Sequence, residues 1–142
     1  MRIGEVARRA GVSTKTVRFY ESQGLLAVDR LSNGYRDYDE SHVTLVREIQ
    51  ELGALGIPVQ QTRPFLDCLV AGNPHGDDCS ASVATYRDTI SALESRISEL
   101  SSRRDRLRAL MLNAVDRTEP ACEFAVALES TLSEPSLVKE SY

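Results

Sequence analysis

The segment NPHGDDC, residues 73–79, gathers one histidine, two aspartates and one cysteine in a short polar stretch. Imidazole, carboxylate and thiolate groups are the usual protein ligands of metal ions, and borderline and soft metals favour thiolate together with imidazole. One interpretation of the segment is therefore half of a metal or effector site. Its candidate ligands are His75, Asp77 and Cys79.

A structural role explains the same segment without any ligand. Gly76 would make a turn, and Asp77 or Asp78 would cap the helix that follows, where a carboxylate also interacts favourably with the helix dipole. The histidine would then lie on the surface and the cysteine would fill the core. Residue types alone leave both interpretations open.

The three cysteines, Cys68, Cys79 and Cys122, form an odd set and a poor disulfide framework, so we expect free thiols or metal ligands in a reducing compartment. Cys68 falls in an apolar run, which favours a buried core residue over a ligand. A third interpretation is a metal-free sensor of oxidants or electrophiles. A helix N-terminus would favour the thiolate form of Cys79, although the two neighbouring aspartates oppose it.

Composition places the chain among soluble proteins. It has 142 residues, of which 42% are hydrophobic, and it contains neither a membrane-spanning run nor the apolar core of a signal peptide. We therefore expect a cytoplasmic protein without a membrane partner. No Ser/His/Asp order, phosphate loop or HExxH motif is present, so an enzyme is not expected.

The charge is distributed unevenly along the chain. The net charge is −4, but residues 1–36 hold seven Lys/Arg against three Asp/Glu, which gives a local +4. Residues 66–142 hold eight against thirteen, which gives −5. A basic end on an acidic body is typical of a protein that contacts DNA through that end.

The basic end carries a helix-turn-helix pattern. Apolar residues at helical spacing run up to Gly11, and Ser13 is a good N-cap for a second helix that ends at Gly24. Basic and polar side chains near the start of such a recognition helix can reach base edges or phosphates in a major groove. The predicted contacts on this helix are Lys15, Thr16, Arg18 and Tyr20.

A hairpin is predicted next, because Asn33-Gly34 is a strong signal for a type I′ turn. The strand after the turn is basic and aromatic, which suits a wing that contacts the sugar-phosphate backbone. Its predicted contacts are Tyr35, Arg36 and Tyr38. Alternatively, Tyr35 and Tyr38 are core residues of a small sheet.

Three further helices are expected. One follows Asp39 or Ser41 and ends at Gly56, and the next either starts late or is kinked, because Pro64 does not fit a helix interior. The last is long and carries a heptad seam, which predicts a coiled coil and hence a homodimer that binds a palindrome. The seam residues are Val83, Tyr86, Ile90, Leu93, Ile97, Leu100, Leu107, Met111 and Ala114, with Arg104 as the one polar entry.

The motifs IGEVARRAGVSTKTVRFYESQGLL, NGYRDYDE and LVREIQELGALGIPVQQ, in this order, resemble the MerR family of bacterial transcription regulators over about residues 1–70. The resemblance implies a mainly α fold, with a winged helix-turn-helix DNA-binding domain followed by a long dimerisation helix in an antiparallel coiled coil. The expected parts are residues 1–72 for the DNA-binding domain, 73–79 for a connector, 80–114 for the dimerisation helix and 115–142 for an effector loop, short helix and tail.

The resemblance also implies a mechanism. Such a regulator binds double-stranded promoter DNA between polymerase elements that are too far apart, and its effector distorts the DNA so that RNA polymerase engages both. The rival from another class is a coiled-coil protein-interaction module without specific DNA binding, against which the local positive charge argues.

Cys79 and Cys122 resemble two of the cysteines with which metal-sensing relatives bind a divalent ion, such as zinc or mercury, across an antiparallel dimer. The chain departs from that pattern, because Asn113 to Val115 stand where relatives carry another cysteine. Zinc generally takes four ligands, so His75, an aspartate of the connector, or Glu119 or Glu123 would have to complete the site.

Overall fold

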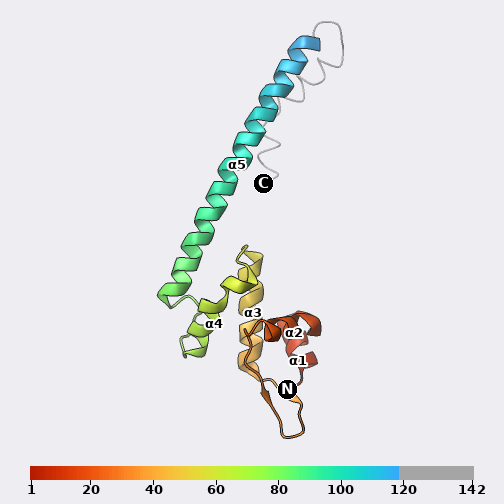
Figure 1. The fold of residues 1–142 in the computed structure, drawn as a ribbon, viewed down its shortest axis with the longest axis vertical. Helices are drawn as coiled ribbons and strands as arrows, with labels where there is room; N and C mark the ends of the chain where they lie inside the picture. Colours follow the sequence, from red (N-terminus) through yellow and green to blue (C-terminus); the bar gives the residue numbers. More distant parts are fainter. Residues whose placement is uncertain (119–142) are drawn as a thin grey trace. The chain divides into compact units, whose positions relative to one another are not determined.

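The computed structural model describes residues 1–118, which are mainly helical. The elements, in chain order, are α1 (Ile3–Ala10), α2 (Thr14–Ser22), β1 (Asp29–Arg30), β2 (Arg36–Asp37), α3 (Glu40–Ala54), the 3₁₀ turn η1 (Val59–Gln61), α4 (Arg63–Val70) and α5 (Ser80–Thr118) (Figure 1). The predicted mainly α fold, with a helix-turn-helix end followed by a long helix, is confirmed. Two units are distinguished along the chain, with the boundary between Ala92 and Leu93, inside the sequence range of α5.

Helices α1 and α2 form the predicted helix-turn-helix. Gly11 ends α1 with φ 73°, a left-handed conformation that glycine adopts without steric cost, and its N–H donates to the carbonyls of Ala7 and Arg8. Two residues later the Ser13 hydroxyl caps α2 by accepting a 3.1 Å hydrogen bond from the Thr16 N–H. Both caps are those expected from the sequence, and together they fix the sharp turn between the helices.

Helix α3 begins with a capping box. The Asp39 carboxylate accepts from the N–H groups of Ser41 and His42, and His42 Nδ1 accepts from the Asp39 N–H at 3.0 Å. The other ring nitrogen of His42 lies 2.8 Å from the Ala27 carbonyl, so the neutral imidazole that accepts at Nδ1 donates at Nε2. This buried histidine therefore ties the start of α3 to the segment that leads into the hairpin.

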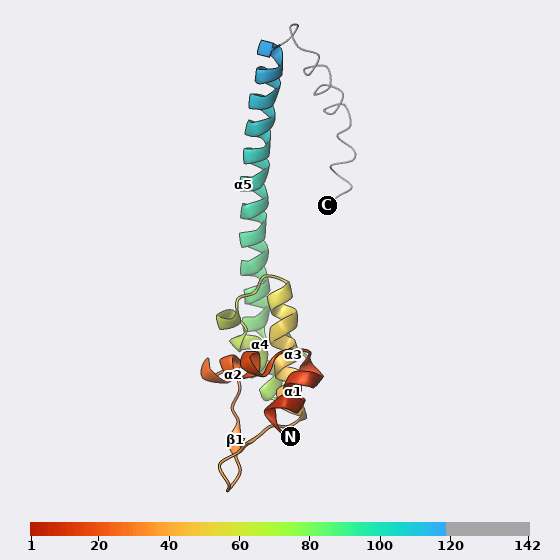
Figure 2. The same cartoon turned by 90° about the vertical axis from the view of Figure 1, so that its right-hand side faces the viewer.

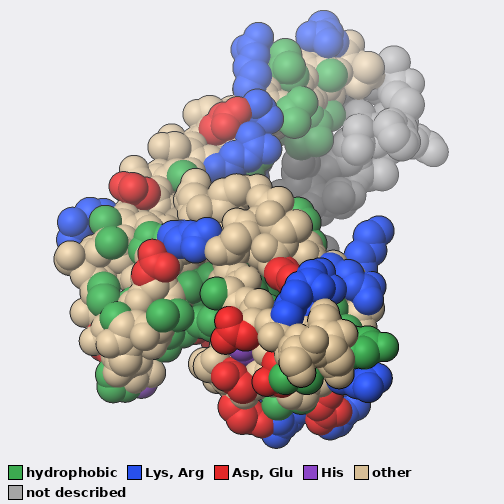
Figure 3. Space-filling model, turned by 60° about the horizontal axis from the view of Figure 1, so that its bottom comes forward, with side chains coloured by type: hydrophobic (Ala, Val, Ile, Leu, Met, Phe, Trp, Pro, Cys, Tyr) green, Lys and Arg blue, Asp and Glu red, His purple; other side chains and the backbone are tan. Residues whose placement is uncertain are grey.

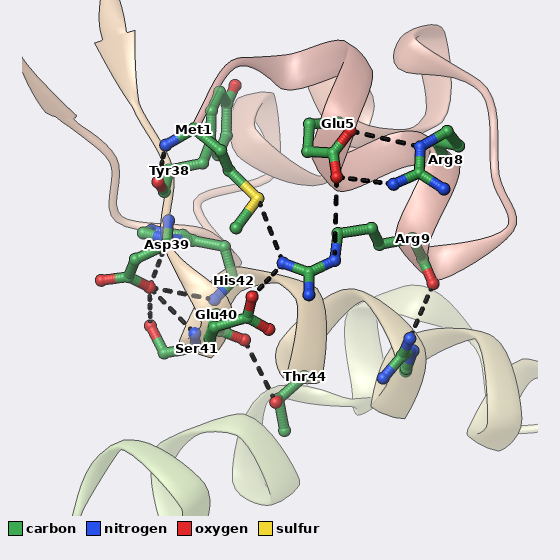
Figure 4. Close-up of polar contacts among 11 residues, drawn as sticks. Met1, Glu5, Arg8, Arg9, Tyr38, Asp39, Glu40, Ser41, His42 and Thr44 are labelled. Carbon is green, nitrogen blue, oxygen red and sulfur yellow. Dashed lines mark hydrogen bonds and ion pairs between the residues drawn. The ribbon is translucent and has the colours of Figure 1, made fainter.

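The apolar face of α3 is the centre of the DNA-binding half. Val43, Val46 and Ile49 are buried in one cluster with Val6 of α1 and Val17 of α2. Polar contacts reinforce the packing, because Arg9 of α1 pairs with Glu40 (Figure 4). The Arg47 guanidinium also donates to the Arg9 carbonyl at 2.8 Å. The orientation of α1 and α2 is therefore set by α3.

The hairpin differs from its sequence prediction in its turn. Asp29 pairs with Asp37 and Arg30 with Arg36, and the Gly34 N–H donates to the Leu31 carbonyl at 2.8 Å. A type I′ turn needs a positive φ at both central residues, which the sequence placed at Asn33 and Gly34. Gly34 has φ 87°, but the φ of Asn33 is not positive, so the turn is of another type. The connection is a three-residue loop with one left-handed glycine, and the short ribbon extends beyond α1 and α2 (Figure 2).

Helix α4 starts late, which is one of the two possibilities that Pro64 left open. The 3₁₀ turn η1 precedes it, and Pro64 occupies the first turn of the helix, where its missing N–H costs no hydrogen bond. Phe65 and Leu66 are buried, and Phe65 packs with Leu52 of α3. The second helix pair is thus joined to the same scaffold as the first.

Helix α5 is continuous from Ser80 to Thr118, four residues longer than the predicted 80–114. Its 39 residues span about 58 Å at about 1.5 Å per residue. Large apolar side chains stay exposed along it, among them Val83, Ile90, Leu93, Ile97, Leu100 and Leu107. Among the described residues, no helix combines the length and apolar character that crossing a membrane requires.

Candidate nucleic-acid interface and cysteine pair

The exposed face of α2 presents two of its four predicted contacts fully. Lys15 and Arg18 are exposed, and no described side chain forms an ion pair with either. Thr16 is half-buried, and its hydroxyl is hydrogen-bonded to the Ser13 hydroxyl at 2.9 Å. Two free cations on the second helix of a helix-turn-helix are suited to DNA phosphates or base edges.

A basic concavity of about 340 Å³ lies between the start of α1, α2 and the hairpin. The guanidinium carbon of Arg2 lies 5.3 Å from the centre of the Tyr35 ring, within the range of a cation–π interaction, and Tyr35 is exposed. We call this surface the basic concavity; it is lined by Arg2, Ile3, Arg18, Gly34, Tyr35, Arg36 and Tyr38.

Arg2 was missed in the sequence prediction because it precedes the first helix and belongs to no motif. The only available signal was the excess of basic residues in the first 36 positions. Its place beside Arg18 and Arg36 is produced by the fold, which brings the N-terminus next to the hairpin: the Tyr38 N–H donates to the Met1 carbonyl at 3.0 Å.

Tyr20 and Tyr38 do not fit their predicted role as surface contacts. Tyr20 is 4% exposed and Tyr38 is 1% exposed. The Tyr20 hydroxyl accepts a hydrogen bond from the Gln50 amide of α3, and the Tyr38 ring packs edge-on against His42 with the centroids 5.5 Å apart. Both are core residues that hold α2 and the hairpin on α3, and for Tyr38 this is the alternative that the sequence left open.

Glu21 of α2 joins the recognition helix to the hairpin. Its carboxylate accepts from Arg36 Nε at 2.8 Å and from the Tyr38 hydroxyl at 3.1 Å. Burial disfavours the ionised carboxylate, but the hydrogen bonds from Arg36 and Tyr38 outweigh it and lower the pKa of Glu21. Burial and the Glu21 charge raise the pKa of Tyr38 to about 12. Arg36 is therefore partly engaged within the protein, unlike Lys15 and Arg18.

Charge on the surface is mixed, as Figure 3 shows for one face, where Lys and Arg side chains lie beside Asp and Glu side chains. The net charge of −4 is thus compatible with a local cationic site. Only the contacting surface must be basic for phosphate binding.

Cys68 and Cys79 form a disulfide, with their Cα atoms 6.0 Å apart. The expectation of free thiols is wrong for this pair, and the interpretation of Cys68 as only a core residue is incomplete. Cys68 is 2% exposed near the end of α4, whereas Cys79 is half-buried immediately before α5. In the chain-entropy account, closing a ring of this size stabilises the folded state by about 3 kcal/mol.

The tentative metal ligands of the connector do not converge. His75 is exposed, and its backbone N–H donates to Asp78 Oδ2 at 2.9 Å, which closes a turn within the connector. Asp77 accepts from the Tyr86 hydroxyl at 3.0 Å, and Cys79 is bonded to Cys68. Within residues 1–118 no group of three or more His, Cys, Asp and Glu side chains is placed to hold a metal ion. The fourth tentative ligand, Cys122, lies outside the described residues.

Comparison with known proteins identifies the family. Residues 1–67 match the family model described as MerR HTH family regulatory protein. The chain is 34% identical over 123 residues to the HTH-type transcriptional regulator HmrR of Rhizobium leguminosarum bv. viciae, which covers 86% of this chain and 92% of HmrR. It is 31% identical to the HTH-type transcriptional regulator ZntR of Escherichia coli K12, over 77% of both chains.

Solved structures agree with these sequence relatives. The transcription regulator PbrR691 from Ralstonia metallidurans CH34, in complex with lead(II), has a TM-score of 0.66 and 29% identity, covering 78% of this chain and 84% of PbrR691. HiNmlR, a MerR family regulator bound to promoter DNA, shares the fold with a TM-score of 0.50 at 24% identity, covering 74% of this chain and 78% of that one.

The helix-turn-helix, the hairpin beside it and the long helix thus define a winged-helix transcription regulator rather than an enzyme. More particularly, the chain belongs to the MerR family of helix-turn-helix regulators.

Replacing Tyr38 with Phe should lower the free energy of unfolding by about 1 kcal/mol, because it removes one hydrogen bond to Glu21. The pKa of Tyr38 is higher in the folded protein than the value of about 10 in an unfolded chain, so the stabilisation by its protonated hydroxyl is fully present below about pH 10. This contribution is lost as the pH rises towards 12, the pKa of folded Tyr38. Urea unfolding at pH 7 and at alkaline pH would measure both effects.

The matched control is Tyr35→Phe, which alters an exposed tyrosine of the same hairpin and should change stability by less than about 0.5 kcal/mol. Equal losses in the two variants would show that the hydrogen bond between Tyr38 and Glu21 does not stabilise the hairpin.

Proposed function

We propose that this protein is a dimeric transcription regulator that binds a palindromic promoter element through α2 and the hairpin, and changes transcription by distorting the DNA. The observation that carries the proposal is the basic concavity, in which Arg2, Arg18 and Arg36 line one open surface between the recognition helix and the wing. Guanidinium groups bind phosphate in bidentate geometry, so this surface suits a DNA backbone.

Different parts of the surface would make different contacts. Lys15 and Arg18 near the start of α2 would enter the major groove or bind its flanking phosphates, with Thr16 in a lesser role. Arg2, Tyr35 and Arg36 would bind the sugar-phosphate backbone beside it. Tyr20 and Tyr38 are left out of the contact set, because they are buried.

Dimerisation would use the seam of α5. Ile90, Leu93 and Ile97 are each at least half exposed, which is a large apolar stripe for one helix. Burying an Ile or Leu side chain contributes about 1.5–3 kcal/mol, so pairing two such seams is strongly favourable. A two-fold dimer presents two copies of α2, which is why a palindromic element is expected.

Regulation would follow the scheme implied by the family. The dimer would bind between two promoter elements, and an effector would change the twist or bend of the DNA so that RNA polymerase can engage both. The rival function, a coiled-coil interaction module, does not account for a cationic surface on a helix-turn-helix.

The effector would act at Cys79, and a metal ion such as zinc or mercury is the first candidate. The relative PbrR691 holds lead(II), which supports a thiophilic metal. Asp77 accepts a hydrogen bond from Tyr86, and the exposed His75 does not converge with it, so this proposal depends on Cys79 and on Cys122 of a partner chain, and it requires Cys79 in its reduced form.

Replacing Arg18 with Ala should weaken binding to the protein's own promoter region by about 5- to 150-fold, because one cationic contact is worth about 1–3 kcal/mol. Fluorescence anisotropy across a salt series would measure it. Arg108→Ala, an exposed arginine of α5, is the matched control and should keep wild-type affinity. Equal affinity of wild type and Arg18→Ala at matched salt would refute the interface and favour the interaction module.

Replacing Ile97 with Glu should raise the dimer dissociation constant at least about tenfold, because the seam would then bury a carboxylate. The control is Ser98→Glu, which adds the same charge one residue away, off the seam. Sedimentation velocity separates the two species. A dimer that tolerates Ile97→Glu as well as Ser98→Glu would show that α5 does not pair through this seam.

Zinc and mercury should each bind the reduced protein stoichiometrically and tightly in competition with a chelator, and Cys79→Ser should abolish the binding. Cys68→Ser is the control and should retain it, because Cys68 is not among the proposed ligands. Binding that is no tighter in the wild type than in Cys79→Ser would exclude a metal effector at Cys79.

A further inference from the structure

The pair formed by Cys68 and Cys79 has a feature that the metal proposal does not use: the two sulfur atoms differ in access. Cys68 is 2% exposed within α4, while Cys79 is half-buried immediately before α5. A dissolved oxidant or reductant therefore reaches Cys79 first, and Cys68 is the sulfur that completes or releases the bond. One accessible and one shielded sulfur is the arrangement that supports thiol–disulfide exchange in two steps.

The connector holds the two sulfurs together independently of their bond. The Asn73 side-chain amide donates to the Cys68 carbonyl at 2.9 Å and lies 3.6 Å from Cys79 Sγ. Further along, the buried Ser82 hydroxyl donates to the Gly76 carbonyl at 2.6 Å, which fixes the connector to the first turns of α5. The reduced thiols would therefore stay close, and a high effective concentration favours their reoxidation.

Tight packing at Gly76 supports the same conclusion. A Cβ atom at this position would lie 2.5 Å from Glu48 Oε1 and 3.2 Å from the Phe65 carbonyl oxygen, so a larger residue would displace the Glu48 carboxylate and crowd α4. Tyr86 of α5 packs on Phe65 of α4, with ring centroids 5.1 Å apart. Cys68 on α4 and Cys79 immediately before α5 are thus held near each other by contacts other than their bond.

We propose that Cys68 and Cys79 are a reversible dithiol–disulfide pair whose oxidation withdraws Cys79 from the effector site, so that the redox state gates effector binding. DNA-containing compartments are kept reducing, and the disulfides that form there are usually transient and redox-sensing. The gating part rests on the proposed role of Cys79 as an effector ligand. The proposal that Cys68 and Cys79 form a reversible pair does not depend on that role.

The exchange balances with a low-molecular-weight disulfide as the oxidant. The Cys79 thiolate attacks one sulfur of that disulfide, forms a mixed disulfide and releases one thiolate. The Cys68 thiolate then attacks Cys79 Sγ, forms the bond between Cys68 and Cys79 and releases the second thiolate. The oxidant gains the two electrons that the protein thiols lose, and the two thiol protons pass to the released thiolates.

The pair is tested by equilibrating the full-length protein with oxidised and reduced glutathione in varied ratios, then alkylating free thiols and analysing the protein by mass spectrometry. The expected result is one reversible two-electron transition that links Cys68 to Cys79. It should be absent in Cys68→Ala and Cys79→Ser and kept in Cys122→Ser. Circular dichroism checks that each variant is folded. A bond through Cys122, or no bond at any ratio, would overturn the pair.

The gate is tested by zinc titration of the oxidised and reduced forms in competition with a chelator. Oxidation should abolish zinc binding by the wild type, and dithiothreitol, after its removal, should restore it. Reduced Cys68→Ala should bind zinc as the reduced wild type does, and after the same oxidant it should carry the mixed disulfide on Cys79, because no second thiol releases it. Equal zinc affinity of the oxidised and reduced wild type would overturn the gate. If the reduced protein binds neither zinc nor mercury, the proposal of a metal effector at Cys79 is refuted. The mass-spectrometric experiment still tests whether Cys68 and Cys79 form a reversible pair.

Discussion

The apolar face of α3 is the constraint on which the DNA-binding half depends. The first helix-turn-helix packs on it through Val6 and Val17, and α4 contacts the same helix through Phe65 against Leu52. Each buried side chain of this size contributes about 1.5–3 kcal/mol, so burial of this face adds several kcal/mol to the stability of the unit. The hairpin is attached at the start of α3 and the connector near its middle, so the two candidate functional regions have one scaffold in common.

Polar contacts from α3 convert this packing into a defined geometry. His42 binds the Ala27 carbonyl before the hairpin, Arg47 binds the Arg9 carbonyl at the end of α1, and Gln50 binds the Tyr20 hydroxyl of α2. Because each of these contacts is directional, they fix the angle at which α2 presents Lys15 and Arg18. The Glu21 carboxylate then aligns the hairpin with α2 through Arg36 and Tyr38.

Local features were predictable from the sequence, and features that depend on tertiary packing were not. The caps at Gly11 and Ser13 follow from local backbone chemistry, and the structure confirms them. For the starts of α3 and α4 the sequence left two possibilities each, and the structure has the Asp39 cap and the late start. Whether an aromatic residue of α2 or the hairpin faces solvent depends on what packs against it, so Tyr20 was assigned wrongly and Tyr38 stayed ambiguous. The predicted type I′ turn was wrong, because the Asn33-Gly34 signal does not fix the length of the loop.

The disulfide between Cys68 and Cys79 also depends on tertiary packing and was not predicted from the sequence. Eleven positions separate Cys68 from Cys79, and this spacing matches no metal or disulfide motif. Their proximity arises because α4 ends and α5 begins beside each other, held by Tyr86 on Phe65 and by Ser82 on Gly76. The connector, whose residue types suggest a ligand cluster, is a hydrogen-bonded and packed turn that ends at one member of the sulfur pair, Cys79.

Footprinting of the wild-type protein on its own promoter region by hydroxyl-radical cleavage tests most directly that this chain is a dimeric DNA-binding regulator. The account predicts two protected half-sites related by a dyad, centred one helical turn of about 34–36 Å or a multiple of it apart, because a two-fold dimer presents α2 twice. Protection of a single half-site, or no protection at a salt concentration at which the protein is folded, would contradict it.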